Sequence, residues 1–140
     1  MKELTIAAAP ENADTVVEFV DGLLEGYDCD MRVLMSIEVA VDEIFTNIAN
    51  YSYSPGTGDA TVRVEVTEDP LTADITFIDR GRPYDPLARE DPDTTLSVEE
   101  RPIGGMGILI VKKSMDAVSY EYRDGMNILT IRKNIENRQD

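Results

Sequence analysis

The sequence predicts an α/β two-layer sandwich, in which a mixed, mostly antiparallel sheet is covered on one face by three helices. The first observation is that the period of the apolar residues switches between about 3.6 and 2, which orders the elements as β-α-α-β-β-loop-α-β-β. The second is that neighbouring strands are separated by short turn signals, which favour antiparallel pairing. The third is the length of 140 residues, which suits one domain over residues 1–140.

The first half of the chain predicts one strand and two helices. Residues 2–8 suit a short strand, and a helix should begin near Pro10, because proline fits a first helical turn. Gly26 is the expected stop of that helix. A second helix is predicted from about residue 30 to residue 53, before Pro55. Its apolar residues recur at spacings of three and four, and they are Val33, Ile37, Val41, Ile44, Ile48 and Tyr51.

The second half predicts four strands and one helix. Strands with alternating apolar residues are expected at 61–67 and 71–79, with a turn at Asp69-Pro70 between them. Asp79 shares the parity of Ile75 and Phe77, so it should point toward the buried face. The remaining predicted elements are a loop at 80–103, a helix entered through the glycines at 104–107, and strands at 117–122 and 126–135 joined by Asp124-Gly125.

Composition narrows the possible functions. The net charge of −15 excludes direct nucleic-acid binding through a basic face. The chain has no histidine, which excludes Ser/His/Asp catalysis. The single Cys29 excludes an internal disulfide framework. The N-terminus lacks an apolar signal-peptide core and no apolar run could span a membrane, so we expect a cytoplasmic protein with no membrane partner. The acidic surface favours either solubility or a basic partner.

Three polar features accompany these elements. Glu43 and Asn47 lie one helical turn apart, with Asn50 near them. They favour either a solvated face or an acid positioned over a substrate, with amides that bind a hard cation through oxygen. The segment DRGRPYDP (79–86) favours either a simple turn or a buried Asp79 that meets the amine of an adenine, with Gly81 allowing close approach. The segment GGMG (104–107) favours either flexibility or phosphate binding at a helix N-terminus.

Taken in this order, the three segments resemble the boxes of the Bergerat-fold, histidine-kinase-like ATPase superfamily. Within it, the chain is most similar to the bacterial anti-sigma-factor serine/threonine kinases. The matching segments are DEIFTNIANYSY, DRGRPYDP and GGMGILIVKKSMD. The resemblance implies ATP and Mg²⁺ as cofactors, with Glu43 as the catalytic base, Asn47 on the metal and Asp79 on the adenine amine. The cofactor-binding set that it implies is Asn47, Asn50, Asp79, Gly81, Pro83, Gly104, Gly105, Gly107 and Thr130.

The resemblance also implies a lid and shows one departure. Residues from about 85 to 103 would form the ATP lid, and Arg89 and Arg101 are candidates for contact with the γ-phosphate by their place in it. The family often has a histidine four residues after the magnesium asparagine, where this chain has Tyr51.

Two main functions follow from the resemblance. The first is an ATP-dependent protein serine/threonine kinase and anti-sigma factor that phosphorylates a small anti-anti-sigma (STAS-type) protein and binds a sigma factor. The second is a non-catalytic ATP/ADP-binding module that sequesters a partner protein. A nucleotide-sensing regulator with another partner is a third, and a homodimer is left open because the family is often dimeric.

Overall fold

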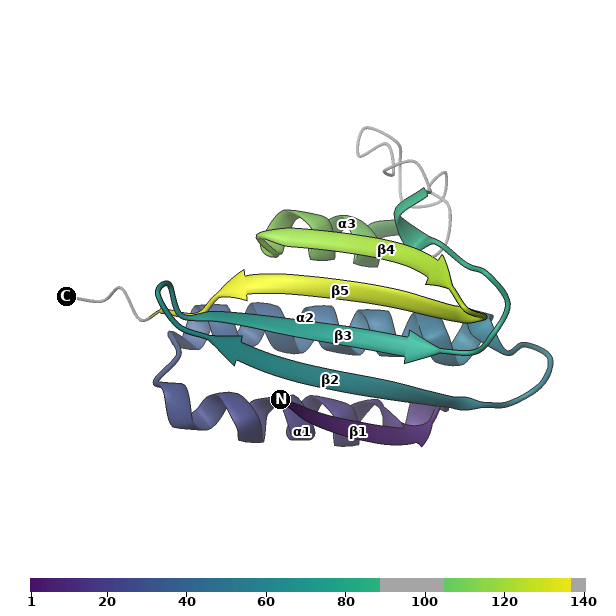
Figure 1. Ribbon diagram of the computed structural model, residues 1–140, viewed down its shortest axis with the longest axis horizontal. Helices are drawn as coiled ribbons and strands as arrows, with labels where there is room; N and C mark the ends of the chain where they lie inside the picture. Colours follow the sequence, from purple (N-terminus) through teal and green to yellow (C-terminus); the bar gives the residue numbers. More distant parts are fainter. Residues whose placement is uncertain (89–104, 137–140) are drawn as a thin grey trace.

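The computed structural model describes residues 1–88 and 105–136, which form a five-stranded sheet with three α-helices on one of its faces (Figure 1). The strands are β1 (Lys2–Ala7), β2 (Asp59–Thr67), β3 (Thr72–Asp79), β4 (Ala117–Arg123) and β5 (Met126–Asn134). Their order in the sheet is β1-β2-β3-β5-β4. All four pairings are antiparallel, so these strands contain no parallel pair of the kind that a mixed sheet would have. The predicted two-layer sandwich, with three helices on one face of the sheet, is confirmed.

The helices are α1 (Ala13–Leu24), α2 (Met31–Asn47) and α3 (Gly105–Ser114), and α2 packs between the other two. Short 3₁₀ turns at Pro10–Asn12 and Glu25–Tyr27 flank α1. Asp30 caps α2, because its carboxylate accepts a hydrogen bond from the backbone N–H of Arg32 at 2.7 Å. A further 3₁₀ turn, Pro86–Ala88, follows the end of β3.

The core lies between the helices and the sheet. Alternate residues of β3 and β5 face the helices, and Phe77 is paired in register with Leu129 and Ile75 with Ile131. Phe45 of α2 is fully buried against them. Burial of such apolar side chains is the main source of the stability that holds α2 at a fixed angle over the sheet. The core therefore gives rigid support to the end of β3 and to the polar residues that lie there.

Three local details differ from the sequence predictions. The α-helical part of the first helix ends at Leu24, and a 3₁₀ turn continues through Gly26 to Tyr27. The residue that takes the left-handed conformation at the end is Asp28, at φ 53°, and not Gly26. The second helix ends its α-helical part at Asn47, and a π-helical turn follows at Ile48–Ser52. Tyr51, the last of the apolar residues predicted for this helix, lies in the turn, and its ring contacts that of Tyr84 in the loop after β3 at a centroid distance of 5.5 Å.

Two further features complete the fold. The Asp124-Gly125 turn between β4 and β5 is confirmed, since both residues have positive φ, at 54° and 76°. Cys29 lies half-buried in the connection between α1 and α2, where its thiol donates to the carbonyl of Leu24 at 3.6 Å. Within residues 1–88 and 105–136, no helix is long and apolar enough to cross a membrane.

Candidate active site

Asp79 is the last residue of β3 and its side chain points into the layer between sheet and helices. It is only 3% exposed, which confirms the inward orientation that the strand parity predicts. Its Oδ1 accepts hydrogen bonds from the backbone N–H of Gly81 and from the side-chain amide of Asn127, both at 2.9 Å. A buried carboxylate is costly without such donors. These two bonds hold the carboxylate in place, and among the described residues they leave Oδ2 for another donor.

Asn127 connects Asp79 to the loop that follows β3. Asn127 is paired with Asp79 in the β3–β5 register, and it is 4% exposed. The same amide nitrogen also donates to the carbonyl of Arg82 at 2.9 Å, and its oxygen accepts from the backbone N–H of Tyr84 at 3.0 Å and from the hydroxyl of Tyr120. One side chain therefore fixes the carboxylate and the first residues of the loop together.

The loop after β3 is also attached to the end of the second helix. The backbone N–H of Arg82 donates to the carbonyl of Ser52 at 2.9 Å, and that of Arg80 donates to the hydroxyl of Tyr53 at 2.8 Å. A Cβ placed on Gly81 would overlap the Ser52 backbone. Glycine is required at this position because two backbone segments meet there without room for a side chain.

Glu43 and Asn47 lie together on α2, where α2 faces the start of α3. Both are half-buried. Burial raises the pKa of the Glu43 carboxyl, and the neighbouring Asp42 raises this pKa further, while a hydrogen bond with the Asn47 side chain lowers it. A Cβ placed on Gly107 would overlap the Glu43 carboxyl group, so the first turn of α3 lies directly against that carboxyl. Glycine is needed here as well, because it leaves space for an acidic group at a helix N-terminus.

A cavity joins the two clusters. It is lined mainly by apolar side chains, with Asp79 and Asn127 in one part of its wall and Asn47 in another. The full lining is Ile44, Asn47, Ile48, Ser52, Phe77, Asp79, Tyr84, Pro86, Ile108, Tyr120, Asn127 and Leu129. It leaves about 20 Å³ for the centre of a water-sized sphere, which is room for about one water molecule. A larger ligand therefore needs wall side chains from the loop or from α3 to move.

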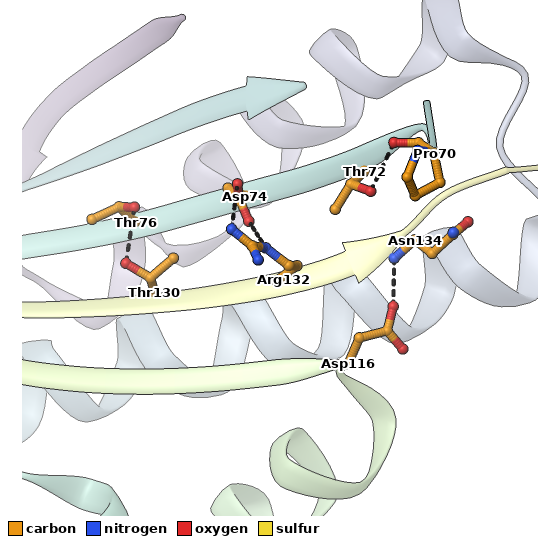
Figure 2. A network of polar contacts seen from close by, with 8 residues as sticks. All are labelled: Pro70, Thr72, Asp74, Thr76, Asp116, Thr130, Arg132 and Asn134. Carbon is orange, nitrogen blue, oxygen red and sulfur yellow. Dashed lines mark hydrogen bonds and ion pairs between the residues drawn. The ribbon is translucent and has the colours of Figure 1, made fainter. Parts of the chain in front are cut away.

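The structure does not bring every predicted site residue to this cavity. Asn50 and Pro83 are exposed and do not line it. Thr130 lies on the opposite face of the sheet, where its hydroxyl is 3.1 Å from that of Thr76 (Figure 2). The reason is strand parity, since Thr130 is an odd number of residues from both Asn127 and Leu129, which face the helices.

Other predicted residues lie outside the part of the chain that the structure describes. Gly104, both candidate arginines (Arg89 and Arg101) and the lid from residue 89 to residue 103 are in this group. Gly105 is the first residue of α3, as its place in the glycine-rich segment predicts.

The sequence analysis missed Asn127 and Tyr120. The signal was available, because Asn127 has the same parity as Leu129 and Ile131 and therefore falls on the apolar face of its strand. The same alternation places Asp79 inside, and it identifies Asn127 as a buried polar residue that needs hydrogen-bond partners.

The side chains present fit a nucleotide with a hard cation. An apolar cavity with one fixed carboxylate suits a purine that carries an amine, and the Asn47 amide oxygen and the Glu43 carboxylate are oxygen ligands of the type that Mg²⁺ prefers. Among the described residues there is no group of three or more Cys, Asp or Glu that could hold a metal ion. Mg²⁺ needs no such group when substrate phosphates supply further oxygens.

The fold is that of a domain of the Bergerat type, and the comparison with known families agrees. The family model of the histidine kinase-like ATPase domain matches residues 6–133. The chain therefore belongs to the histidine kinase-like ATPase domain family. This result confirms the resemblance that the three segments indicated.

The chain is also similar to named proteins and to solved structures. The chain is 28% identical over 100 residues to the serine/threonine-protein kinase BtrW of Bordetella bronchiseptica, covering 71% of this chain and 70% of that protein. It is 26% identical over 146 residues to the serine-protein kinase RsbW of Halalkalibacterium halodurans, covering 99% and 88%. The fold matches the structure of the RsbU and RsbW domains of Rv1364c from Mycobacterium tuberculosis with a TM-score of 0.66 and 16% identity, over 96% of this chain and 33% of that one.

A second solved structure has the same fold. It is the SiaB-SiaC complex from Pseudomonas aeruginosa, with a TM-score of 0.54 and 18% identity, over 93% of this chain and 88% of the matched chain. At these identities the two solved structures establish the fold alone.

Proposed function

We propose that this protein is a cytoplasmic ATP-dependent protein serine/threonine kinase and anti-sigma factor that phosphorylates an anti-anti-sigma protein of the STAS type. The observation that carries this proposal is the arrangement of Glu43 and Asn47 against the first turn of α3, beside a cavity that also contains the fixed carboxylate of Asp79. The names of the relatives BtrW and RsbW support the choice of a serine kinase.

The adenine would be bound at the Asp79 end of the cavity. Oδ1 of Asp79 is occupied by two protein donors, and Oδ2 is the atom that would accept a hydrogen bond from the exocyclic amine. The apolar walls, formed by Ile44, Ile48 and Phe77 among others, would cover the ring. Gly81 allows the base to approach the backbone of the loop.

The phosphates would lie between α2 and the start of α3. The Asn47 oxygen would hold Mg²⁺, which supplies charge neutralisation for the phosphates when it is bound. Gly105 and Gly107 would present backbone N–H groups at the N-terminus of α3. Gly107 lies directly against the Glu43 carboxyl, so the phosphates would meet this helix end beside that acid.

Glu43 would act as the base. Its carboxylate would accept the proton of a serine or threonine hydroxyl of the partner, while the hydroxyl oxygen forms a bond to the γ-phosphorus and the bond to the β-bridging oxygen breaks, releasing ADP. The raised pKa of Glu43 brings its basicity closer to the pH of the reaction, which improves proton transfer. Positioning of the two reactants supplies most of the remaining acceleration.

The second candidate is a module that binds ATP or ADP and sequesters its partner without phosphoryl transfer. The SiaB-SiaC complex, one chain of which has this fold, is an example of such a domain bound to another protein. A sigma factor is the proposed partner for sequestration, and a homodimer is proposed as the assembly.

Incubation of the purified protein with γ-labelled ATP, Mg²⁺ and a STAS-type protein separates the two candidates. Label on a serine or threonine of the STAS protein supports the kinase, and its loss in Glu43→Gln shows that this carboxylate is required. Tight ATP binding with no transferred label supports the module instead. Absence of nucleotide binding would reject both.

A further inference from the structure

An exposed line of apolar side chains runs along α2 on the side away from the sheet. Met31, Met35 and Val39 follow one another at intervals of four residues and are 68%, 58% and 51% exposed. Side chains with this spacing lie on one face of a helix. Single exposed apolar residues are ordinary, but three that form one stripe on a helix are a typical contact surface for another helix. We name Met31, Met35 and Val39 the α2 stripe.

The α2 stripe is set in a strongly acidic part of the chain. Residues 10–50, which include α1 and α2, contain ten Asp and Glu residues and one basic residue, Arg32. This segment, which is made of the two helices and the connections beside them, therefore carries more than half of the net charge of −15. Such a surface attracts a basic partner and repels an acidic one.

Two acidic side chains beside the α2 stripe lie close together between α1 and α2. The Asp21 carboxyl of α1 meets the Glu38 carboxyl of α2, with Glu18 and Glu25 near them. Glu38 directly precedes Val39 of the α2 stripe. Oδ1 of Asp21 is buried and has no hydrogen-bond partner among the described residues. A surface hollow is lined by Glu18, Asp21, Gly22, Glu25 and Leu34.

This arrangement is unfavourable in the protein alone. Two neighbouring carboxylates repel one another, and a buried acceptor oxygen without a donor costs free energy. A guanidinium or ammonium group placed in the hollow would remove both costs, because it donates hydrogen bonds and carries the opposite charge. Methionine side chains are flexible and adapt to the shape of an apolar partner surface.

We propose that the α1–α2 surface, consisting of the α2 stripe and the Asp21–Glu38 pair, is a docking site for a basic amphipathic helix of a partner protein. The apolar face of that helix would cover Met31, Met35 and Val39. A Lys or Arg beside this apolar face would enter the hollow next to Asp21. A second copy of this chain is disfavoured as the occupant, because it would bring the same acidic surface to the contact.

The inference goes beyond the proposed kinase activity, because the docking site needs no nucleotide and shares no residue with the cavity at Asp79. The two can therefore fail independently. Loss of ATP binding would leave the docking surface unchanged, and a failure of docking would leave the nucleotide site unchanged.

The test uses a fluorescent helical peptide of about 18 residues, or five turns, with leucines on one face and lysines elsewhere. A control peptide has the same composition with its leucines spread around the helix. We expect the wild-type protein to bind the amphipathic peptide in a fluorescence anisotropy titration without nucleotide. The double variant Met35→Ser/Val39→Ser should bind at least about tenfold more weakly, since burial of two apolar side chains is lost. Asp21→Asn/Glu38→Gln should also weaken binding and reduce its salt dependence.

Matched controls lie elsewhere on the molecule. Tyr122→Ser removes an apolar side chain of similar exposure from β4, and Glu65→Gln removes an exposed acid from β2. Both should bind the peptide like wild type, and all variants should bind ATP like wild type.

The proposal would be overturned if the control peptide bound equally well, or if the controls lost as much affinity as the α2-stripe variant. It would also be overturned if the wild-type protein formed dimers that Met35→Ser/Val39→Ser abolished, because the stripe would then be covered by a second copy.

Discussion

The side-chain amide of Asn127 donates a hydrogen bond of 2.9 Å to Oδ1 of Asp79, across the register pair that these two residues form between β5 and β3. Both side chains are almost fully buried. The carboxylate therefore keeps one orientation without any ligand. A binding group that is already oriented requires less loss of conformational freedom when the ligand arrives.

Replacement of Asn127 tests this relationship. We expect Asn127→Leu to lower the free energy of unfolding by about 1–3 kcal/mol, because Asp79 and the loop backbone each lose a buried hydrogen-bond partner. It should also weaken ATP binding, since the carboxylate is no longer held. Tyr120→Phe is the control, because it removes one hydroxyl and leaves the bond to Asp79 intact. Urea unfolding and a titration with a fluorescent ATP analogue measure both effects, and unchanged values for Asn127→Leu would contradict the assignment.

Asn47 and Glu43 should separate binding from catalysis. We expect Asn47→Ala to abolish Mg-ATP binding, because the amide oxygen that would hold the cation is removed. Glu43→Gln should preserve binding and remove phosphoryl transfer, because the carboxylate that we propose as the base is lost while the shape of the side chain is kept. Calorimetric titration with Mg-ATP and the transfer of γ-label measure the two properties. Equal nucleotide affinity for wild type and Asn47→Ala would reject this site.

The close backbone contact at Gly81 predicts a large effect for a small change. We expect Gly81→Ala to destabilise the fold by about 1–3 kcal/mol or more, because the new methyl group would overlap the Ser52 backbone. Gly22→Ala is the matched control, since Gly22 is exposed within α1 and nothing lies within 4 Å of a Cβ at that position. It should stabilise the protein by about 0.5–1 kcal/mol, as alanine does in an exposed helix. Thermal and urea unfolding would show the opposite signs.

Asp21 predicts a pH dependence of stability. Burial, together with the neighbouring acids Glu38, Glu18 and Glu25, raises the pKa of the Asp21 carboxyl to about 6. In the unfolded chain the pKa is about 3.9. The folded state therefore binds more protons between about pH 4 and pH 6, so this group stabilises the protein below that range and the contribution is lost as the pH rises through about 6.

Asp21→Asn should remove this dependence. We expect the variant to be more stable than wild type at pH 7 by about 1 kcal/mol after allowance for solvent screening, and to show little advantage below about pH 4. Glu65→Gln changes the net charge equally at an exposed site and serves as the control. Urea unfolding at a series of pH values measures the difference. A constant difference between Asp21→Asn and wild type across the series would contradict the prediction.

The fold could be predicted because the apolar pattern and the turn residues agree along most of the chain. Alternating residues in β3 and β5 specify which side of each strand is buried, and this pattern correctly placed Asp79 inside. The Asp124-Gly125 pair specified the hairpin, because few other residues tolerate positive φ at both positions.

The rest depended on contacts between distant segments. No local pattern shows that Tyr51 stacks on Tyr84, or that α2 ends in a π-helical turn whose last residue accepts a bond from Arg82. Thr130 was expected near the adenine through the family resemblance, whereas strand parity places it beside Thr76 on the other face of the sheet. At that position, the alternation of side chains along β5 decides the orientation and the family resemblance does not.

The connection between α1 and α2 carries the single sulfhydryl of the sequence, Cys29, two residues before Met31. This connection lies at the opposite end of the sheet from the end of β3, where Asp79 is located (Figure 1). A maleimide dye or spin label attached to Cys29 would therefore report from beside the α2 stripe without any engineered residue. Burial raises the pKa of the Cys29 thiol, so labelling should proceed slowly at neutral pH and faster in mildly alkaline buffer. The unmodified chain thus contains an attachment point for a spectroscopic reporter that is remote from the cavity at Asp79.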